Sequence, residues 1–295
     1  MKGGKNMKRT IIALCMVFIL MISVGFVMAS AKNQKFSLPE NAVKVAPGVF
    51  YLGKTFDKGK FVEGYAFMMK DEKRFAKPNS FCGDGICDSR ENINKCPVDC
   101  GGSEDPVEPD TSSCYEFLAK GAKWKTVENY LVDPANAKGL GELFIRSNLA
   151  SNIGKWENAG GRDILGNEIF GIVERTKLYS LNNKNEMMFG DIDSPGAIGV
   201  TIVWGTFGSP PPFRELVEWD MVFDDVDFDW SSMRESNKMD FENIATHELG
   251  HVVGMGDLYS DFCSQQTMYG YSWNGDIIKR DLADGDIAGI QKLYN

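Results

Sequence analysis

The chain has two histidines, His247 and His251, and they stand four residues apart in the segment HELGHVVGMGD. On an α-helix this spacing places both imidazoles on one face, about 40° apart around the helix axis. Two neutral imidazoles in that position can chelate a single Zn²⁺ ion. The spacing therefore predicts a helix that carries two ligands of one metal site.

A third ligand must come from another residue type, because zinc sites that carry out hydrolysis usually have three protein ligands. Gly254 can end the helix, since glycine tolerates the left-handed conformation found at helix C-termini. Asp257 is the first carboxylate after that turn. We therefore expect Asp257 to be the third ligand, with Asp261 as the competing candidate.

Glu248 follows His247 directly, so its side chain is expected beside the metal rather than on it. Zinc lowers the pKa of a bound water molecule toward about 7, and a nearby carboxylate can take the proton of that water as it attacks a carbonyl carbon. The segment thus predicts Glu248 as the general base of a hydrolytic reaction.

One helix must position these groups. In DFENIATHELGHVVG, Asp240 is the expected N-cap, and the run has no proline before Gly254. The side of the helix opposite the histidines is apolar and is expected to face the core. Its residues are Ala245, Leu249, Val252 and Val253.

This pattern resembles the extended zinc motif of the metzincin metalloendopeptidases, in the form that has aspartate as third ligand. Met268, in QQTMYGYS, matches the methionine turn of that family and lies eleven residues after Asp257. The segments DFENIATHELGH and DLADGDIAGIQKLYN are most similar to the matrixin branch. The resemblance covers residues 114–295 and is strong over the last 55 residues.

The resemblance implies a mixed α/β (α+β) catalytic domain with a twisted, mostly parallel sheet of five strands, an active-site helix and a C-terminal helix. Residues 215–225 would lie near an antiparallel edge strand, along which such enzymes bind extended peptides. One catalytic zinc is implied. A second zinc held by three histidines is excluded, since no histidine is left; a structural Ca²⁺ on Asp224, Asp225 and Asp227 is the alternative to a solvated loop there.

Periodicity adds elements around the motif. Apolar residues at helical spacing predict a helix over 139–160 and a second one over 286–294. The β-rich runs 167–175 and 196–207 read as strands. Two further β-rich runs, 43–56 and 60–70, are separated by the turn-like DKGK. They predict a small β module or pro-region over residues 32–75.

The N-terminus indicates export. Basic residues precede an uncharged run from Ile11 to Ala29 and a small-residue cleavage pattern, so residues 1–31 read as a signal peptide, or as an uncleaved membrane anchor. Removal of residues 1–31 takes away four of the 32 Lys and Arg residues and none of the 41 Asp and Glu residues. The net charge then changes from −9 to −13. So acidic a surface makes nucleic acid an improbable partner.

The cysteines agree with an oxidising compartment. Four of them lie in residues 76–101, which are too short to bury a core, so disulfides are expected there and zinc thiolates are the rival. The four are Cys82, Cys87, Cys96 and Cys100. Their pairing stays open. The acidic stretch 102–113 reads as a linker. Cys114 and Cys263 remain, and we predict that they pair and tie the start of the domain 114–295 to the zinc loop.

These patterns together predict a secreted, monomeric zinc metalloendopeptidase that acts on protein or peptide substrates. Two rivals stay open. One is an extracellular surface-binding protein with a vestigial zinc site, and the other is a zinc amidase acting on cell-envelope substrates. A carboxylate beside the ligands, Glu248, argues for a catalytic site, because a structural zinc site has no use for it.

Overall fold

The computed structural model describes residues 35–72, 92–93, 100, 110–176 and 178–295. The predicted signal, residues 1–31, lies outside the described residues, as do Cys82, Cys87 and Cys96. Cys100 is described and is disulfide-bonded. Export and the pairing within the Cys-rich segment therefore stay predictions.

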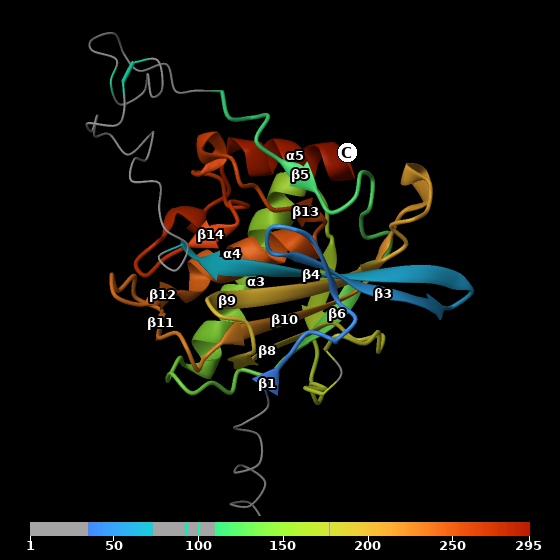
Figure 1. Cartoon of the computed structure of the whole chain (residues 1–295), viewed down its shortest axis with the longest axis horizontal. Helices are drawn as coiled ribbons and strands as arrows, with labels where there is room; N and C mark the ends of the chain where they lie inside the picture. Colours follow the sequence, from blue (N-terminus) through green and yellow to red (C-terminus); the bar gives the residue numbers. More distant parts are fainter. Residues whose placement is uncertain (1–34, 73–91, 94–99, 101–109, 177) are drawn as a thin grey trace, which may run out of the picture.

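A mixed β-sheet forms the centre of the described structure (Figure 1). Its main strands follow the spatial order β2-β3-β4-β9-β10-β8-β6-β7. Their bounds are β2 Val43–Ala46, β3 Val49–Asp57, β4 Lys60–Asp71, β6 Glu128–Val132, β7 Leu165–Glu168, β8 Glu186–Ile192, β9 Ala197–Gly205 and β10 Leu216–Asp224. The short strands are β1 Lys35–Phe36, β5 Glu116–Phe117, β11 Trp230–Ser231, β12 Met239–Asp240, β13 Met255–Gly256 and β14 Tyr271–Ser272.

Five of these strands make the sheet that the family resemblance implies. β7, β6, β8 and β10 run parallel to one another, and β9 pairs antiparallel with β10. β9 and β10 are the strands expected within 196–207 and 215–225. Both strands are buried because they lie in the middle of the sheet, and neither face of β10 is exposed to solvent. The mixed α/β fold with a mostly parallel five-stranded sheet is confirmed.

The N-terminal strands extend that sheet. β2, β3 and β4 form an antiparallel meander, and β4 pairs antiparallel with β9 from Glu63 to Lys70. An unpaired β9 would present a row of free N–H and C=O groups, and β4 satisfies them. The β-rich runs expected within residues 32–75 are therefore present, and they share one sheet with residues 114–295.

Three helices in the described residues pack on one face of the sheet: α3 Glu142–Gly160, α4 Phe241–Val252 and α5 Asp284–Tyr294. α3 and α5 are the helices expected over 139–160 and 286–294. Trp156 of α3 is fully buried between helices and donates its indole N–H to the carbonyl of Thr246, 2.9 Å away. A second apolar cluster on the other face contains Phe36, Leu52 and Val62, so the N-terminal region covers that face.

The strand expected over 167–175 is shorter than predicted. β7 ends at Glu168, and the chain from 169 to 175 is not a strand. Phe170 and Ile172 of the expected strand are 101% and 85% exposed. Alternation of apolar residues produces a strand only where a neighbouring strand pairs with it, and the last pairing of β7 is between Tyr130 and Glu168.

Three short 3₁₀ turns complete the described elements: η2 Pro211–Phe213, η3 Asp261–Cys263 and η4 Ile278–Arg280. Within the described ranges we find no helix whose length and apolar character would suffice for a membrane span.

Candidate metal centre

Helix α4 carries the two histidines and is fixed at its N-terminus by Asp240. The Asp240 carboxylate accepts a hydrogen bond from the backbone N–H of Asn243 at 3.0 Å, as expected for an N-cap. The same carboxylate receives two hydrogen bonds from the guanidinium of Arg280, at 2.8 and 2.7 Å. Regular helix ends at Val252, and Gly254 follows in the left-handed region with φ 106°. The chain then reverses toward Asp257.

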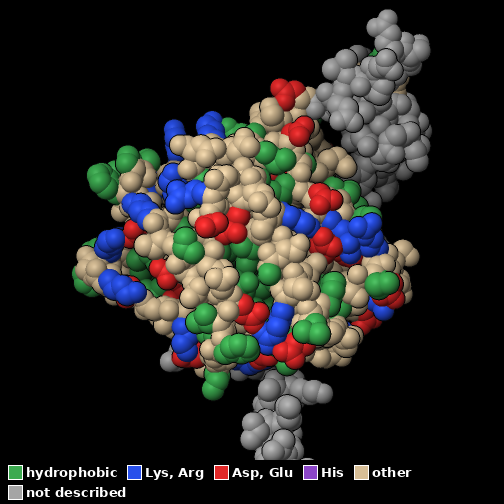
Figure 2. All heavy atoms as spheres, turned by 180° about the vertical axis from the view of Figure 1, so that it is seen from behind, with side chains coloured by type: hydrophobic (Ala, Val, Ile, Leu, Met, Phe, Trp, Pro, Cys, Tyr) green, Lys and Arg blue, Asp and Glu red, His purple; other side chains and the backbone are tan. Residues whose placement is uncertain are grey.

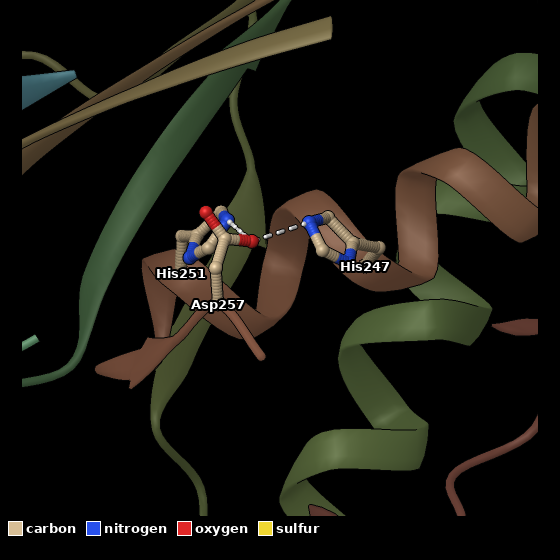
Figure 3. Close-up of side chains that lie close together, drawn as sticks. All are labelled: His247, His251 and Asp257. Atoms are coloured by element: carbon tan, nitrogen blue, oxygen red, sulfur yellow. Dashed lines mark ion pairs between the residues drawn. The ribbon is translucent and has the colours of Figure 1, made fainter. Parts of the chain in front are cut away.

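Asp257 lies between the two imidazoles (Figure 3). Its Oδ1 atom is 3.2 Å from Nε2 of His247 and 3.3 Å from Nε2 of His251. One ligand atom from each residue lies within 4.8 Å of the others, so the three atoms can share one cation. Asp261 is exposed and is not part of this group. The structure thus brings Asp257, and not Asp261, beside the two histidines, and the role of Asp257 as third ligand stays a prediction.

The ring orientation of each histidine is set by a hydrogen bond of Nδ1, the nitrogen that does not face Asp257. Nδ1 of His247 lies 2.8 Å from the carbonyl oxygen of Thr267, and Nδ1 of His251 lies 3.0 Å from that of Met255. A carbonyl oxygen can only accept, so each Nδ1 carries the proton and each Nε2 presents a lone pair. The two Nε2 atoms and Oδ1 of Asp257 are buried and make no hydrogen bond. Three inward-facing lone pairs without a donor fit a divalent cation.

Electrostatics at the site agree with this fit. Burial opposes ionisation of Asp257, but His251 and His247 outweigh burial and hold the pKa of its carboxyl well below the usual range. Burial lowers the pKa of His247, which favours the neutral, metal-binding imidazole. At His251 burial is outweighed by the Asp257 carboxylate, which raises the pKa. A cation bound between them therefore competes with a proton at His251.

Glu248 lies under strand β9 and is fully buried. Its Oε2 accepts a hydrogen bond of 2.6 Å from the hydroxyl of Thr201, whereas Oε1 has no hydrogen-bond partner. Burial raises the pKa of Glu248 to about 7. Gly199 makes room for this side chain, since a Cβ there would come within 2.7 Å of Oε1. Thr201 and Gly199 were missed in the sequence because they reach Glu248 only through the packing of β9 on α4.

Met268 packs beneath α4, where it is fully buried. Its sulfur lies against Gly250, at a place where a Cβ would not fit. The turn around Met268 is held by Asp286 of α5, whose carboxylate accepts hydrogen bonds from the backbone N–H groups of Thr267 and Met268 at 2.7 and 3.1 Å. Met268 therefore supports the helix that carries His247 and His251.

The predicted bond between Cys114 and Cys263 is present, with the two α-carbons 5.6 Å apart. Cys263 stands between Asp257 and Met268 in the chain, so the bond ties the loop after Asp257 to the start of residues 114–295.

Residues 207–295 match the matrixin family model. Over 56 residues the chain is 45% identical to matrilysin from Homo sapiens. That alignment covers 19% of this chain and 20% of matrilysin, so the chain spans about a fifth of the relative it matches. The matched matrixin-like region contains α4, the Met268 turn and α5. Both similarities support a metalloprotease of matrixin type, and the zinc dependence of that family agrees with the His247, His251 and Asp257 group.

Within the matrixin-like region, Tyr259 contacts the expected third ligand. Its hydroxyl lies 3.0 Å from Oδ2 of Asp257 and 2.5 Å from the carbonyl oxygen of Pro47. The sequence offers no sign of this contact, because Pro47 belongs to the turn between β2 and β3.

In the acidic run after β10, carboxylates accept hydrogen bonds from backbone N–H groups. Asp224 accepts hydrogen bonds from the N–H groups of Ile192, Val226 and Asp227, and Asp225 accepts one from Ala137. Among the described residues this run does not form a group of potential metal ligands. A calcium ion at Asp224, Asp225 and Asp227 stays a prediction.

Proposed function

We propose that this chain is a zinc metalloendopeptidase in which His247, His251 and Asp257 hold one Zn²⁺ ion. The observation that carries the proposal is the convergence of three buried ligand atoms without a hydrogen-bond partner, beside a carboxylate oxygen of Glu248 that also lacks one. A zinc ion held there would polarise the carbonyl group of a substrate and make water more acidic. The matrixin similarity of residues 207–295 supports the same reaction class.

Glu248 acts as the general base in this proposal. Thr201 holds Oε2, which leaves Oε1 to accept a proton from the attacking water. A pKa of about 7 allows Glu248 to take up that proton and then transfer it to the amide nitrogen that leaves. The full burial of Glu248 keeps its carboxylate in one position and away from bulk water.

We further propose that the protein acts outside the cytoplasm on protein or peptide substrates, as a monomer, after export through residues 1–31. The formal charge of −9 and the even set of cysteines after Cys15 support this location and argue against nucleic acid as a partner. On the face shown in Figure 2, basic, acidic and apolar side chains all reach the surface.

Glu248→Gln tests the assignment of the base. The variant is expected to bind one zinc per chain, as the parent does, and to lose at least about 100-fold of the rate at which casein is cleaved. Cleavage is measured before and after brief trypsin treatment that is stopped with a serine-protease inhibitor, and zinc by elemental analysis. Glu40→Gln, at an exposed position, serves as the matched control. Parent-like cleavage by Glu248→Gln would rule out this base.

A further inference from the structure

Basic side chains gather on one side of a chain whose formal net charge is −9. In Figure 2 the Lys and Arg side chains are most frequent along the left side of the view, which is the side where Figure 1 shows the end of the β3–β4 hairpin. Two neighbouring cavities open there, and Lys125 lines both of them. The distribution of charge in these cavities differs from that of the chain as a whole.

The first cavity has a volume of about 320 Å³, and the charged residues that line it are all basic. They are Lys120, Lys123, Lys125, Arg214 and Lys292. None of the five forms an ion pair with a carboxylate of the described residues. Lys123 donates to the carbonyl of Leu293 at 2.8 Å, and Arg214 donates to that of Ser209 at 2.8 Å. Carbonyl groups orient these side chains but leave their positive charge uncompensated.

The second cavity, of about 470 Å³, is separated from the first by the turn η2. Its basic residues are Lys54, Lys60 and Lys125, and one acidic residue, Glu63, also lines it. Lys60 forms an ion pair with Glu215, whereas Lys54 has no carboxylate partner among the described residues. The hydroxyl-bearing residues Thr206 and Ser209 complete the polar lining. We call the basic residues of the two cavities together the basic patch.

Two exposed aromatic rings border the basic patch. Phe61 and Phe213 line the second cavity and are 62% and 68% exposed. The ammonium group of Lys54 lies 4.8 Å from the centroid of the Phe61 ring, so that ring already contacts a cation. The ring of Phe213 makes no contact with another ring or a cation within the described residues. It offers an apolar face beside a group of cations, against which a sugar ring can lie.

The charge of the basic patch is complementary to a polymer with repeated anionic groups. At physiological ionic strength the Debye length is about 8 Å, so acidic residues elsewhere on the surface are largely screened from a ligand bound at the patch. A small anion would contact the cations of one cavity only. An extended polyanion can contact both cavities, because both open beside Lys125. Outside the cytoplasm, where we propose that the chain acts, acidic polysaccharides are such polymers.

We infer that the basic patch binds an acidic polysaccharide, with sulfate or carboxylate groups of the polymer on the lysine side chains and a sugar ring against Phe213. The patch is separate from the candidate metal centre. Gly205 of β9 pairs with Glu63, which lines the second cavity, whereas Gly199 lies against Glu248. Six residues of an extended strand, about 20 Å, lie between these two points. Binding at the patch therefore holds the protein on a polymer without contact to the metal centre.

Three variants of the full chain test the proposal. Lys120→Glu/Lys125→Glu reverses two charges of the basic patch at exposed positions. Lys35→Glu/Lys44→Glu is the matched control, because it changes the net charge equally at exposed positions of β1 and β2. Phe213→Ser removes the exposed ring without a change of charge. Near-UV circular dichroism checks that each variant keeps its tertiary packing, and Phe213→Ser decides the matter if the double variant of the patch does not fold.

Binding is measured by fluorescence anisotropy in about 0.15 M NaCl with labelled dextran sulfate, polygalacturonate, uncharged dextran and poly-glutamate of matched chain length. The parent is expected to bind the two acidic polysaccharides and not dextran. Lys120→Glu/Lys125→Glu is expected to bind them at least about tenfold more weakly, because it places like charges against the polymer. Lys35→Glu/Lys44→Glu is expected to match the parent. Phe213→Ser should weaken binding of the polysaccharides and leave that of poly-glutamate unchanged.

Parent-like binding of the acidic polysaccharides by Lys120→Glu/Lys125→Glu would overturn the proposal, as would an equal loss in Lys35→Glu/Lys44→Glu. Poly-glutamate bound as tightly as the polysaccharides, with no effect of Phe213→Ser, would assign the basic patch to acidic segments of proteins instead. Equal binding of dextran and dextran sulfate would show that the charge of the patch does not select the ligand.

Discussion

The phenyl ring of Phe67 lies on the imidazole of His251, with the ring planes inclined by only 23°. One ring comes from the N-terminal strand β4 and the other from the helix that carries the candidate ligands. The N-terminal strands are therefore part of the environment of the candidate metal site. Properties of that site measured on the full chain depend on both regions.

Asp257→Asn is expected to weaken zinc binding by at least about 100-fold, because it removes the single anionic ligand from a buried site. Zinc affinity is measured by competition with a chromophoric chelator. Asp261→Asn, at the exposed competing position, is expected to bind zinc as the parent does. An affinity loss in Asp261→Asn and none in Asp257→Asn would reverse the ligand assignment.

Gly250→Ala is expected to destabilise the protein by about 2 kcal/mol or more, since a Cβ there collides with the sulfur of Met268 and with Trp156. The same substitution at Gly154 of α3, where a Cβ meets nothing within 4 Å, is expected to stabilise by roughly 0.5–1 kcal/mol. Urea unfolding of the two variants measures the contrast. Similar free energies of unfolding for both would show that the methionine turn does not pack tightly on α4.

Replacement of both Cys114 and Cys263 by alanine is expected to cost about 2–5 kcal/mol of unfolding free energy, because the bond closes a long loop with a sequence separation of 149. Zinc affinity should fall as well, since Cys263 anchors the loop between Asp257 and Met268. Urea unfolding and zinc competition on one preparation test both parts. Unchanged zinc affinity would mean that the disulfide stabilises the fold as a whole and does not affect zinc binding.

Asp220→Asn is expected to change how stability depends on pH. Burial, and then the carboxylates of Glu218 and Glu186, raise the pKa of Asp220 well above its ordinary value of 3.8. Such a group stabilises the folded state fully below its unfolded pKa, and this contribution is lost as the pH rises through the folded value. The parent should therefore lose stability from pH 5 to pH 8, and Asp220→Asn should lose less.

Urea midpoints at the two pH values measure this effect. Asp163→Asn, at an exposed position, is the control and should keep the decline of the parent. An identical decline in Asp220→Asn would mean that the pKa of Asp220 is not raised in the folded state, so that this carboxyl is already ionised at pH 5.

Local spacing determined the parts of the site that lie on one helix. The four-residue interval between His247 and His251, the N-cap at Asp240 and the apolar face of α4 follow from helical periodicity, which involves only neighbours in the chain. α3 and α5 could be predicted for the same reason. The absence of further histidines made a carboxylate the expected third ligand, and Asp257 lies where that argument places it.

Only the tertiary structure decided which distant groups meet these residues. An alternating pattern marks a strand but does not name its partner, because strand pairing joins residues far apart in sequence. The runs 43–56 and 60–70 therefore predicted strands, whereas their place beside β9 could not be predicted. The contacts of Thr201 with Glu248 and of Phe67 with His251 depend on that pairing and packing. The sequence alone thus determined the candidate ligands, and the packing of the sheet decided that β4 lies beside them.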